Sequence, residues 1–171
     1  MAPGWDARTR ADSEERLAPI GVALDRLERA PSSALDIGTG TGTGAFVLAS
    51  RYPNAEIVGI DLSEAMIAKA QEKAAARGAS VRFEVADIAS YSRREPFDLV
   101  LLLNMPVFFE PTAALVAPGG YVVTIASRGA TTPFHTPSET LDRGFGRRGL
   151  RTVATGTSGQ AIYHIAERPA A

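Results

Sequence analysis

The sequence predicts an α/β domain: a doubly wound, mostly parallel sheet of seven strands between two layers of helices, with a C-terminal antiparallel hairpin. Three observations carry this prediction. From Ala34 onward, short apolar runs alternate with segments of helical periodicity, which is typical of parallel β-α units. The strand candidates are nearly all apolar, as expected where helices cover both faces of a sheet. After residue 150, two alternating segments follow each other directly and indicate the hairpin.

The individual elements follow from these patterns. We expect helices near residues 43–51, 64–77 and 111–117, and strands at 34–37, 56–60, 81–86, 98–103, 120–126, 150–155 and 161–166. A last helix should begin at Thr136, with Pro137 at its first position and Glu139 reaching back to form a capping box, and it should end around Gly144–Gly146. Residues 157–159 supply the hairpin turn.

The N-terminal part has a different pattern. Residues 1–11 predict a loose lead-in, and Asp12–Glu15 predict a capped helix start. Apolar residues at helical spacing then indicate one amphipathic helix that ends before Pro31. We therefore divide the chain into an N-terminal segment with this helix, residues 1–33, and a main domain, residues 34–171.

Length and composition set the class of protein. The chain has 171 residues, enough for one core, and its net charge of −1 favours neither nucleic acid nor an anionic membrane. It has no cysteine, so it has no disulfide or thiolate site. No apolar run approaches the roughly 20 residues of a membrane span, and the first residues lack the pattern of a signal peptide. We expect a soluble cytoplasmic protein.

Two groups of charged or titratable residues have unremarkable interpretations. The only basic cluster, at residues 143–151, could contact phosphate, but a solvated helix end is favoured because glycines interrupt the cluster and the net charge of the chain is slightly negative. Nucleic acid is therefore not an expected partner. The two histidines have no metal-ligand spacing with acidic residues, so no metal is expected.

The most informative segment is Leu35–Ala45, with the sequence LDIGTGTGTGA. An acidic residue, Asp36, precedes four alternate glycines, and glycine permits both positive φ and close approach of a ligand. The spacing also fits the turn of a dinucleotide-binding fold. Two further acids decide between these alternatives, because Asp61 and Asp87 each close the next strand candidate. Three acids at consecutive strand ends fit one bound nucleoside that is contacted at several points.

Five segments together resemble the class I S-adenosylmethionine-dependent methyltransferases. LDIGTGTG is similar to the first motif of that family, and the later motifs are matched in order by VGIDLSEAMI, VADI, FDLVLLLN and LVAPGGYVV. The resemblance implies the cofactor S-adenosyl-L-methionine and the product S-adenosyl-L-homocysteine. It covers nearly the whole chain.

The resemblance also implies cofactor contacts. The loop residues Gly38, Thr39, Gly40 and Gly42 should run under the methionine and ribose portions of the cofactor, while Asp36 holds the loop or meets the amino group through water. The Asp61 carboxylate should accept from both ribose hydroxyls. An alternative is that Asp61, followed by Ser63, simply caps the next helix.

The adenine contacts are implied in the same way. Leu62 and Met66 should sandwich the ring, Asp87 should accept from its exocyclic amine, and the Ile88 N–H should meet a ring nitrogen. Asp87 could instead cap the following turn, and Met66 could simply fill the core.

The acceptor side is less defined. Asn104-Met105-Pro106-Val107 follows the fourth strand, where related amino-group methylases carry Asn-Pro-Pro-Tyr; the departure weakens any claim of adenine or glutamine methylation. Three interpretations of Asn104 stay open: a residue of the reacting face, a contact to the cofactor's carboxylate or amino group, or a turn residue. His135 is the best-placed candidate base, although a lone loop histidine is more often solvated. His164 is expected to be structural.

The expected function is methyl transfer to oxygen or nitrogen of a small-molecule acceptor. Three alternatives stay open: a non-catalytic S-adenosylmethionine-binding protein with a regulatory or partner role, a nucleic-acid or protein N-methyltransferase, and an NAD-dependent enzyme. Little sequence is left for a lid, so the N-terminal segment around Trp5, a second subunit in a homodimer, or the substrate itself should close the cleft.

Overall fold

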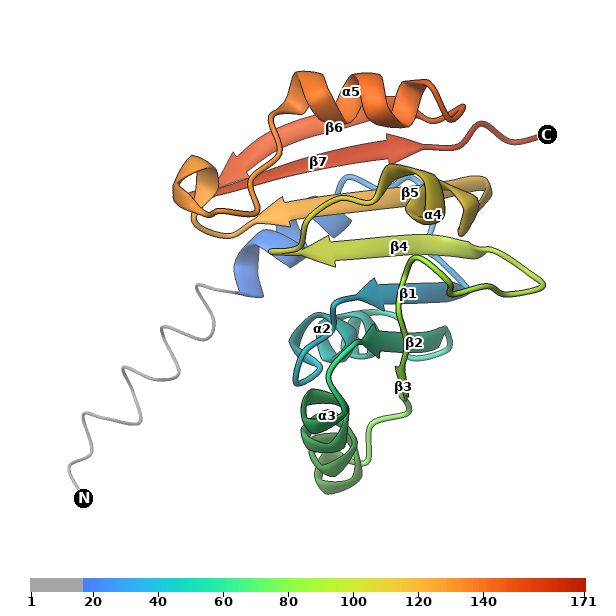
Figure 1. Ribbon diagram of the computed structural model, residues 1–171, viewed down its shortest axis with the longest axis vertical. Helices are drawn as coiled ribbons and strands as arrows, with labels where there is room; N and C mark the ends of the chain where they lie inside the picture. The colour runs from blue at the N-terminus through green and yellow to red at the C-terminus, as the bar shows by residue number, and fades with distance from the viewer. Residues whose placement is uncertain (1–16) are drawn as a thin grey trace.

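A single seven-stranded sheet organises the computed structural model, which describes residues 17–171 (Figure 1). The strand order is β3-β2-β1-β4-β5-β7-β6. The first five strands run parallel, and β7 is antiparallel to both β5 and β6. The strands are β1 (Ser33–Ile37), β2 (Glu56–Asp61), β3 (Arg82–Val85), β4 (Phe97–Leu103), β5 (Val116–Ala126), β6 (Arg151–Ser158) and β7 (Ala161–Glu167). The predicted fold class is confirmed.

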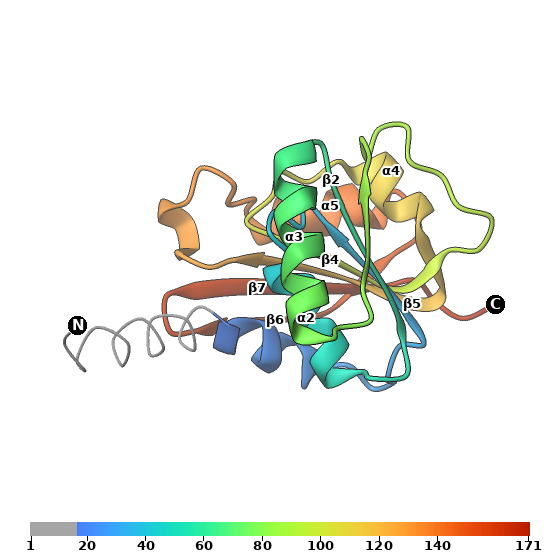
Figure 2. The same ribbon diagram turned by 90° about the horizontal axis from the view of Figure 1, so that it is seen from below.

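Helices cover both faces of the sheet (Figures 1 and 2). One face packs against the helix over residues 17–24, α2 (Thr43–Arg51) and α3 (Glu64–Arg77). The other face packs against α4 (Phe109–Ala114) and α5 (Ser138–Gly146). A short 3-10 helix, η1 (Gly129–Thr131), follows β5. None of the helices within residues 17–171 is long and apolar enough to cross a membrane.

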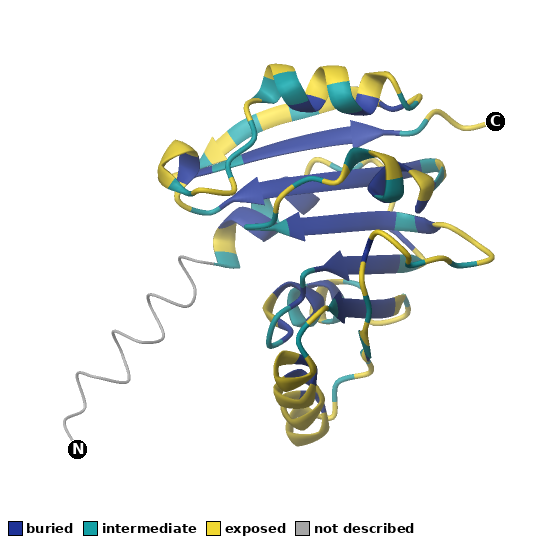
Figure 3. Cartoon of the chain, in the orientation of Figure 1, coloured by how far each residue is buried: buried dark blue, intermediate teal, exposed yellow. Residues whose placement is uncertain are grey.

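The core lies on both sides of the central strands, which Figure 3 shows as buried. Side chains alternate between the two faces along a strand, so Leu99 and Leu101 of β4 pack toward α2 and α3, whereas Val100 and Leu102 pack toward α4 and α5. All four are at most 1% exposed. This explains why the central strands are apolar at nearly every position instead of alternating.

The strand order reverses between β1 and β4. The chain passes from β1 outward to β2 and β3, and then returns to place β4 on the other side of β1. In open α/β sheets a crevice forms at such a point, outside the carboxyl ends of the strands. The loops after β1, β2, β4 and β5 therefore meet at one edge of the sheet.

The boundary between α4 and β5 differs from the prediction. The helix expected at 111–117 ends at Ala114, and β5, expected from 120, already begins at Val116. Val116 pairs with Phe97, and the register then shifts before Leu99 pairs with Tyr121. The Pro-Gly-Gly segment at 118–120 therefore forms an irregularity inside the strand, not a loop before it.

Smaller corrections concern the caps and turns. The capping box of Thr136 and Glu139 is wrong, because Pro137 occupies the N-cap position of α5 and no side chain caps the helix. The helix ends at Gly146, within the predicted interval. β6 continues to Ser158, so Gly159 and Gln160 make the hairpin turn. The N-terminal helix ends at residue 24, and its predicted start at residues 12–15 lies outside the described residues.

Candidate active site

The loop between β1 and α2 is shaped by glycines with positive φ. The angles are +68° at Gly38, +55° at Gly40 and +92° at Gly42, a region that other L-residues rarely adopt. At Gly40, a Cβ atom would meet nothing within 4 Å. A Cβ at Gly38 would lie 2.2 Å from the Met105 sulfur, and one at Gly42 would meet Phe46 and Phe83. Gly40 is thus the glycine of the three that borders open space.

Asp36 holds this loop from beneath. Its Oδ2 accepts hydrogen bonds from the Thr39 hydroxyl at 2.7 Å and from the Ala45 amide at 2.9 Å. Burial raises the pKa of Asp36 to about 6, against the lowering effect of these two hydrogen bonds, and the nearby Asp61 charge adds to the rise. Asp36 is only 2% exposed, so its effect on a ligand is indirect: it holds the loop in the conformation that a ligand would meet.

Asp61 joins the loop to the end of β2. Its Oδ2 accepts from the Gly40 amide and its Oδ1 from the Ser63 amide, each at 2.9 Å. Helix α3 has its own N-cap, because the Ser63 hydroxyl accepts from the Met66 amide at 3.3 Å. Each carboxylate oxygen keeps a further acceptor position, since an ionised carboxylate offers about four. Asp61 is therefore free to accept from two ligand hydroxyls while it holds the loop.

Three exposed apolar side chains gather beside Asp61. Leu62 is 71% exposed and Met66 is 41% exposed, and Val85, which pairs with Asp61 in the sheet, is 50% exposed. Exposed apolar side chains that cluster at strand ends are suited to a flat apolar ligand group. Val85 was not among the residues predicted for this site.

The residues predicted to bind the far edge of adenine follow β3. The Asp87 Oδ1 accepts from the Ala89 amide at 2.9 Å, which is the local turn that sequence reasoning offered as an alternative. This bond leaves the other carboxylate oxygen without a hydrogen-bond partner in the described chain. The Ile88 side chain is buried in the core, so only its main chain is available to a ligand.

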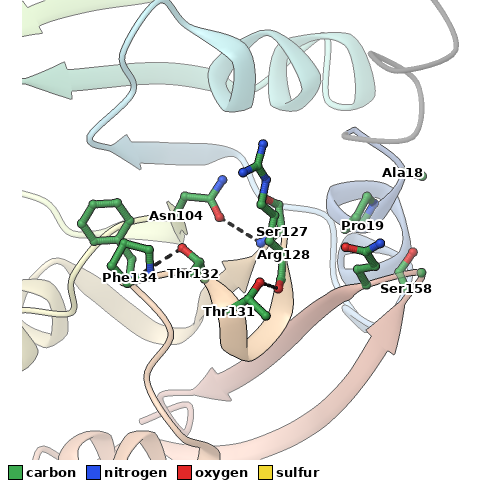
Figure 4. Close-up of a pocket in the computed structure, with 12 residues that line it drawn as sticks. Ala18, Pro19, Asn104, Ser127, Arg128, Thr131, Thr132, Phe134 and Ser158 are labelled. Atoms are coloured by element: carbon green, nitrogen blue, oxygen red, sulfur yellow. Dashed lines mark hydrogen bonds between the residues drawn. The ribbon is translucent and has the colours of Figure 1, made fainter.

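Asn104 connects the ends of β4 and β5. It has a φ of +53°, the only positive value at a non-glycine residue in the described chain. Its Oδ1 accepts from the Ser127 amide at 2.8 Å, which directs the amide NH2 group away from Ser127 (Figure 4). The next residue, Met105, lies against Gly38, so residues 104 and 105 border the glycine loop.

A large open pocket lies beyond Asn104, and we call it the acceptor pocket (Figure 4). Its volume is about 700 Å³. It lies at the carboxyl ends of β4 and β5, between the β6–β7 hairpin and the start of the described chain. Its lining residues include Pro19, Asn104, Arg128, Thr131, Phe134 and Gln160.

The two histidines lie outside the acceptor pocket. His135 and His164 line a separate cavity of about 20 Å³. Phe134 is the only residue that lines both this cavity and the acceptor pocket. His164 is 1% exposed, and its Nε2 lies 2.9 Å from Asp142 Oδ1 and 3.0 Å from the Thr152 hydroxyl. These contacts support a structural role for His164. Trp5 lies outside the described residues.

Sequence reasoning missed most of the acceptor pocket. Arg128 and the residues of the hairpin turn were not predicted to face a ligand. A positional signal was present for Arg128, because it stands two residues after β5, at the edge where ligands bind in open α/β sheets. No signal was present for the hairpin, since its position over that edge depends on the pairing of β7 with β5.

Comparisons with known proteins agree with this geometry. The sequence profile of a family described as a methyltransferase domain matches residues 34–120. The demethylmenaquinone methyltransferase of Thermus thermophilus is 37% identical over 73% of this chain and 61% of its own length. The trans-aconitate 2-methyltransferase of Methylobacterium nodulans is 36% identical over 67% of this chain and 43% of its own length. The chain thus spans about half the length of these relatives.

A solved structure shows the same fold. The magnesium protoporphyrin IX methyltransferase of Synechocystis, crystallised with bound S-adenosylhomocysteine, superposes with a TM-score of 0.73 at 17% identity, covering 92% of this chain and 83% of that chain. The chain belongs to the class I S-adenosylmethionine-dependent methyltransferases.

The described residues fit this cofactor. Gly40 leaves space for close approach, Asp61 retains acceptor positions, and Leu62, Met66 and Val85 offer an apolar surface beside them.

Proposed function

We propose that this chain transfers a methyl group from S-adenosylmethionine to an oxygen or nitrogen atom of a small molecule bound in the acceptor pocket. The observation that carries the proposal is the wall formed by residues 104 and 105. Asn104 lines the acceptor pocket, and Met105 lies against Gly38 of the glycine loop. A cofactor on the loop and an acceptor in the pocket would therefore be neighbours, and methyl transfer requires this alignment.

The relatives support a small-molecule acceptor. Their names specify demethylmenaquinone and trans-aconitate, two chemically different small molecules. They support the size class of the acceptor and leave its identity and the methylated atom open. The volume of the acceptor pocket is within the range of small-molecule sites, which supports the same class.

Each residue has a proposed role in binding. When bound, S-adenosylmethionine supplies an electrophilic methyl group on a sulfonium. Gly40 allows the ligand to approach the main chain, and Asp61 accepts hydrogen bonds from the ribose. Leu62, Met66 and Val85 contact the adenine, with Asp87 and the Ile88 N–H at its edge. Gly38, Thr39 and Gly42 keep the loop in its conformation.

The residues that face the acceptor orient it. The Asn104 NH2 group is directed by the bond from Ser127 and is available as a hydrogen-bond donor. His135 is a candidate proton acceptor only if a side-chain movement opens its small cavity to the acceptor pocket. No carboxylate or histidine lines the acceptor pocket in the described chain. This observation favours a reaction that depends on alignment, and it also favours the second candidate, a non-catalytic S-adenosylmethionine-binding protein.

Calorimetry with S-adenosylmethionine, S-adenosylhomocysteine and NAD tests the cofactor. Binding of the first two and no binding of NAD is expected; binding of NAD alone would contradict the proposal. A screen of small acids, alcohols, phenols and amines, with release of S-adenosylhomocysteine as the readout, then separates the two candidates. Cofactor binding without transfer to any acceptor would favour the non-catalytic protein.

A further inference from the structure

The charge on the lining of the acceptor pocket is positive. Of its 12 lining residues, Arg128 is the only charged one. The polar groups around it are neutral and can donate hydrogen bonds, among them the hydroxyl of Ser158 and the amide of Gln160. The described part of this pocket therefore presents a positive charge and hydrogen-bond donors, with no carboxylate to oppose an anion.

The Arg128 guanidinium is available to a ligand. Within residues 17–171 its side chain makes no hydrogen bond or ion pair, whereas Arg148 is paired with Glu110 and Arg151 with Glu167. Its main chain is fixed, because its carbonyl accepts from the Thr131 hydroxyl at 2.7 Å in the turn after β5. Figure 4 shows the side chain extending from this turn beside Asn104. The residue thus has an anchored base and a head group without a partner in the described part of the chain.

We propose that Arg128 binds a carboxylate of the acceptor, so that the substrate class is a small carboxylic acid. A guanidinium offers paired N–H donors in a planar fork that matches the two oxygens of a carboxylate. This inference rests on the proposed function, since it names the acceptor of the same site. Arg128 acts here as a specificity-determining residue.

The methionine portion of the cofactor also carries a carboxylate, which is the other group that Arg128 could bind in this way. The lining of the acceptor pocket favours the acceptor as the source. It combines Arg128 with the β6–β7 hairpin and with Ala18 and Pro19, and it contains none of the loop residues 38–42. Arg128 therefore belongs with the acceptor side of the wall formed by residues 104 and 105.

The test uses matched acids and amides. The full chain is saturated with S-adenosylhomocysteine and titrated calorimetrically with succinate, tricarballylate and benzoate, and with succinamide and benzamide as neutral counterparts. At least one acid should bind about tenfold or more tightly than its amide, because a charge-assisted hydrogen bond is about twice as strong as a neutral one. Its affinity should fall as salt is added, since the guanidinium is exposed.

Three variants assign the effect. Arg128→Gln should weaken acid binding by about tenfold and leave amide binding unchanged, and Arg128→Lys should retain part of the acid affinity. Arg94→Gln is the matched control, because it removes the same charge from an exposed loop before β4, at the opposite edge of the sheet. It should bind the acids as the wild type does.

Several results would overturn the proposal. They are equal binding of acids and amides, no binding of any acid, or unchanged acid binding in Arg128→Gln. Weaker S-adenosylhomocysteine binding in Arg128→Gln with unchanged acid binding would assign the guanidinium to the cofactor carboxylate. Failure of the wild type to bind S-adenosylhomocysteine would instead remove the proposed function, and titration of the acids into the protein alone would still decide whether Arg128 holds a carboxylate.

Discussion

The Asp61 carboxylate accepts a hydrogen bond from the Gly40 amide, 2.9 Å away, across the gap between the ends of β2 and β1. The two residues are 21 positions apart in the sequence. One side chain therefore both fixes the glycine loop and faces the space that the loop encloses. Loss of this carboxylate should affect the shape of the site as well as its contacts with a ligand.

Asp61→Ala should weaken binding of S-adenosylhomocysteine by about tenfold or more, since hydrogen bonds to a charged group contribute roughly 1.5–3 kcal/mol. Titration calorimetry measures this change. Glu64→Ala is the control, because Glu64 is an exposed acid in the first turn of α3 and its loss should leave affinity unchanged. An Asp61→Ala variant that is folded and binds normally would remove Asp61 from the site.

Gly40→Ala should abolish or strongly weaken cofactor binding, because a methyl group would enter the open space above the loop. Gly78→Ala is a matched control: Gly78 has a φ of +60°, close to the +55° of Gly40, and a Cβ there also meets nothing within 4 Å. Both variants should lose about 1 kcal/mol of stability from the left-handed conformation. If thermal unfolding shows equal losses but both variants bind S-adenosylhomocysteine equally well, Gly40 does not border the ligand.

Asp36→Asn should change how stability depends on pH. Burial raises the pKa of Asp36 to about 6 from its ordinary value of 3.8, so its contribution to stability is fully present below pH 3.8 and is lost as the pH rises through 6. Between pH 4.5 and 7.5 the wild type should lose about 2 kcal/mol relative to Asp36→Asn, since one pKa unit corresponds to about 1.4 kcal/mol.

Urea unfolding of both proteins without cofactor, at several pH values across this range, measures the difference. The asparagine can still accept from Thr39 and Ala45 through its Oδ1, so the variant should keep the loop in place. Parallel stability curves for the two proteins would show that the pKa of Asp36 is not raised.

Substitutions of Asn104 test whether its side-chain amide, which lies between the glycine loop and the acceptor pocket, orients the reactants. Asn104→Ala should cost about 2 kcal/mol, from the lost bond to Ser127 and from the φ of +53°, whereas Asn104→Gly should cost about 1 kcal/mol because glycine tolerates that angle. Both variants should lose the same fraction of methyl transfer if the amide orients the reactants. Activity that instead tracks stability, with glycine close to wild type, would limit Asn104 to a turn role.

The sequence predicted the central part of the fold well because its local signals agree with the tertiary structure. β1, β2 and β4 each lie within one residue of their predicted bounds, since each apolar run is followed directly by glycine, aspartate or asparagine. The error at Val116 has a physical reason. Its strand conformation comes from pairing with Phe97, a contact between residues far apart in the chain that no local propensity encodes.

The candidate site, like the fold, was predicted where local motifs determine it. Asp36, Gly40 and Asp61 belong to motifs whose spacing alone brings them to one edge. The bond between Asn104 and Ser127 was not predictable, because it depends on the alignment of β4 with β5 and on a positive φ that is uncommon at non-glycine residues. The position of Arg128 just after β5 was a usable signal, but its neighbours in the acceptor pocket come from the hairpin and the N-terminal helix and were not predictable.

The packing beneath the glycine loop limits which parts of this protein tolerate mutation. A Cβ at Gly44 would lie 2.8 Å from the Asp36 carboxylate, and a Cβ at Gly59 would lie 2.7 Å from the Thr39 hydroxyl. By contrast, Thr131, Thr132 and Phe134 lie on the turns after β5 and are not part of the core clusters. A directed-evolution library for new acceptors should therefore vary these three positions and keep both glycines, so that acceptor preference changes without disturbing the support of the loop.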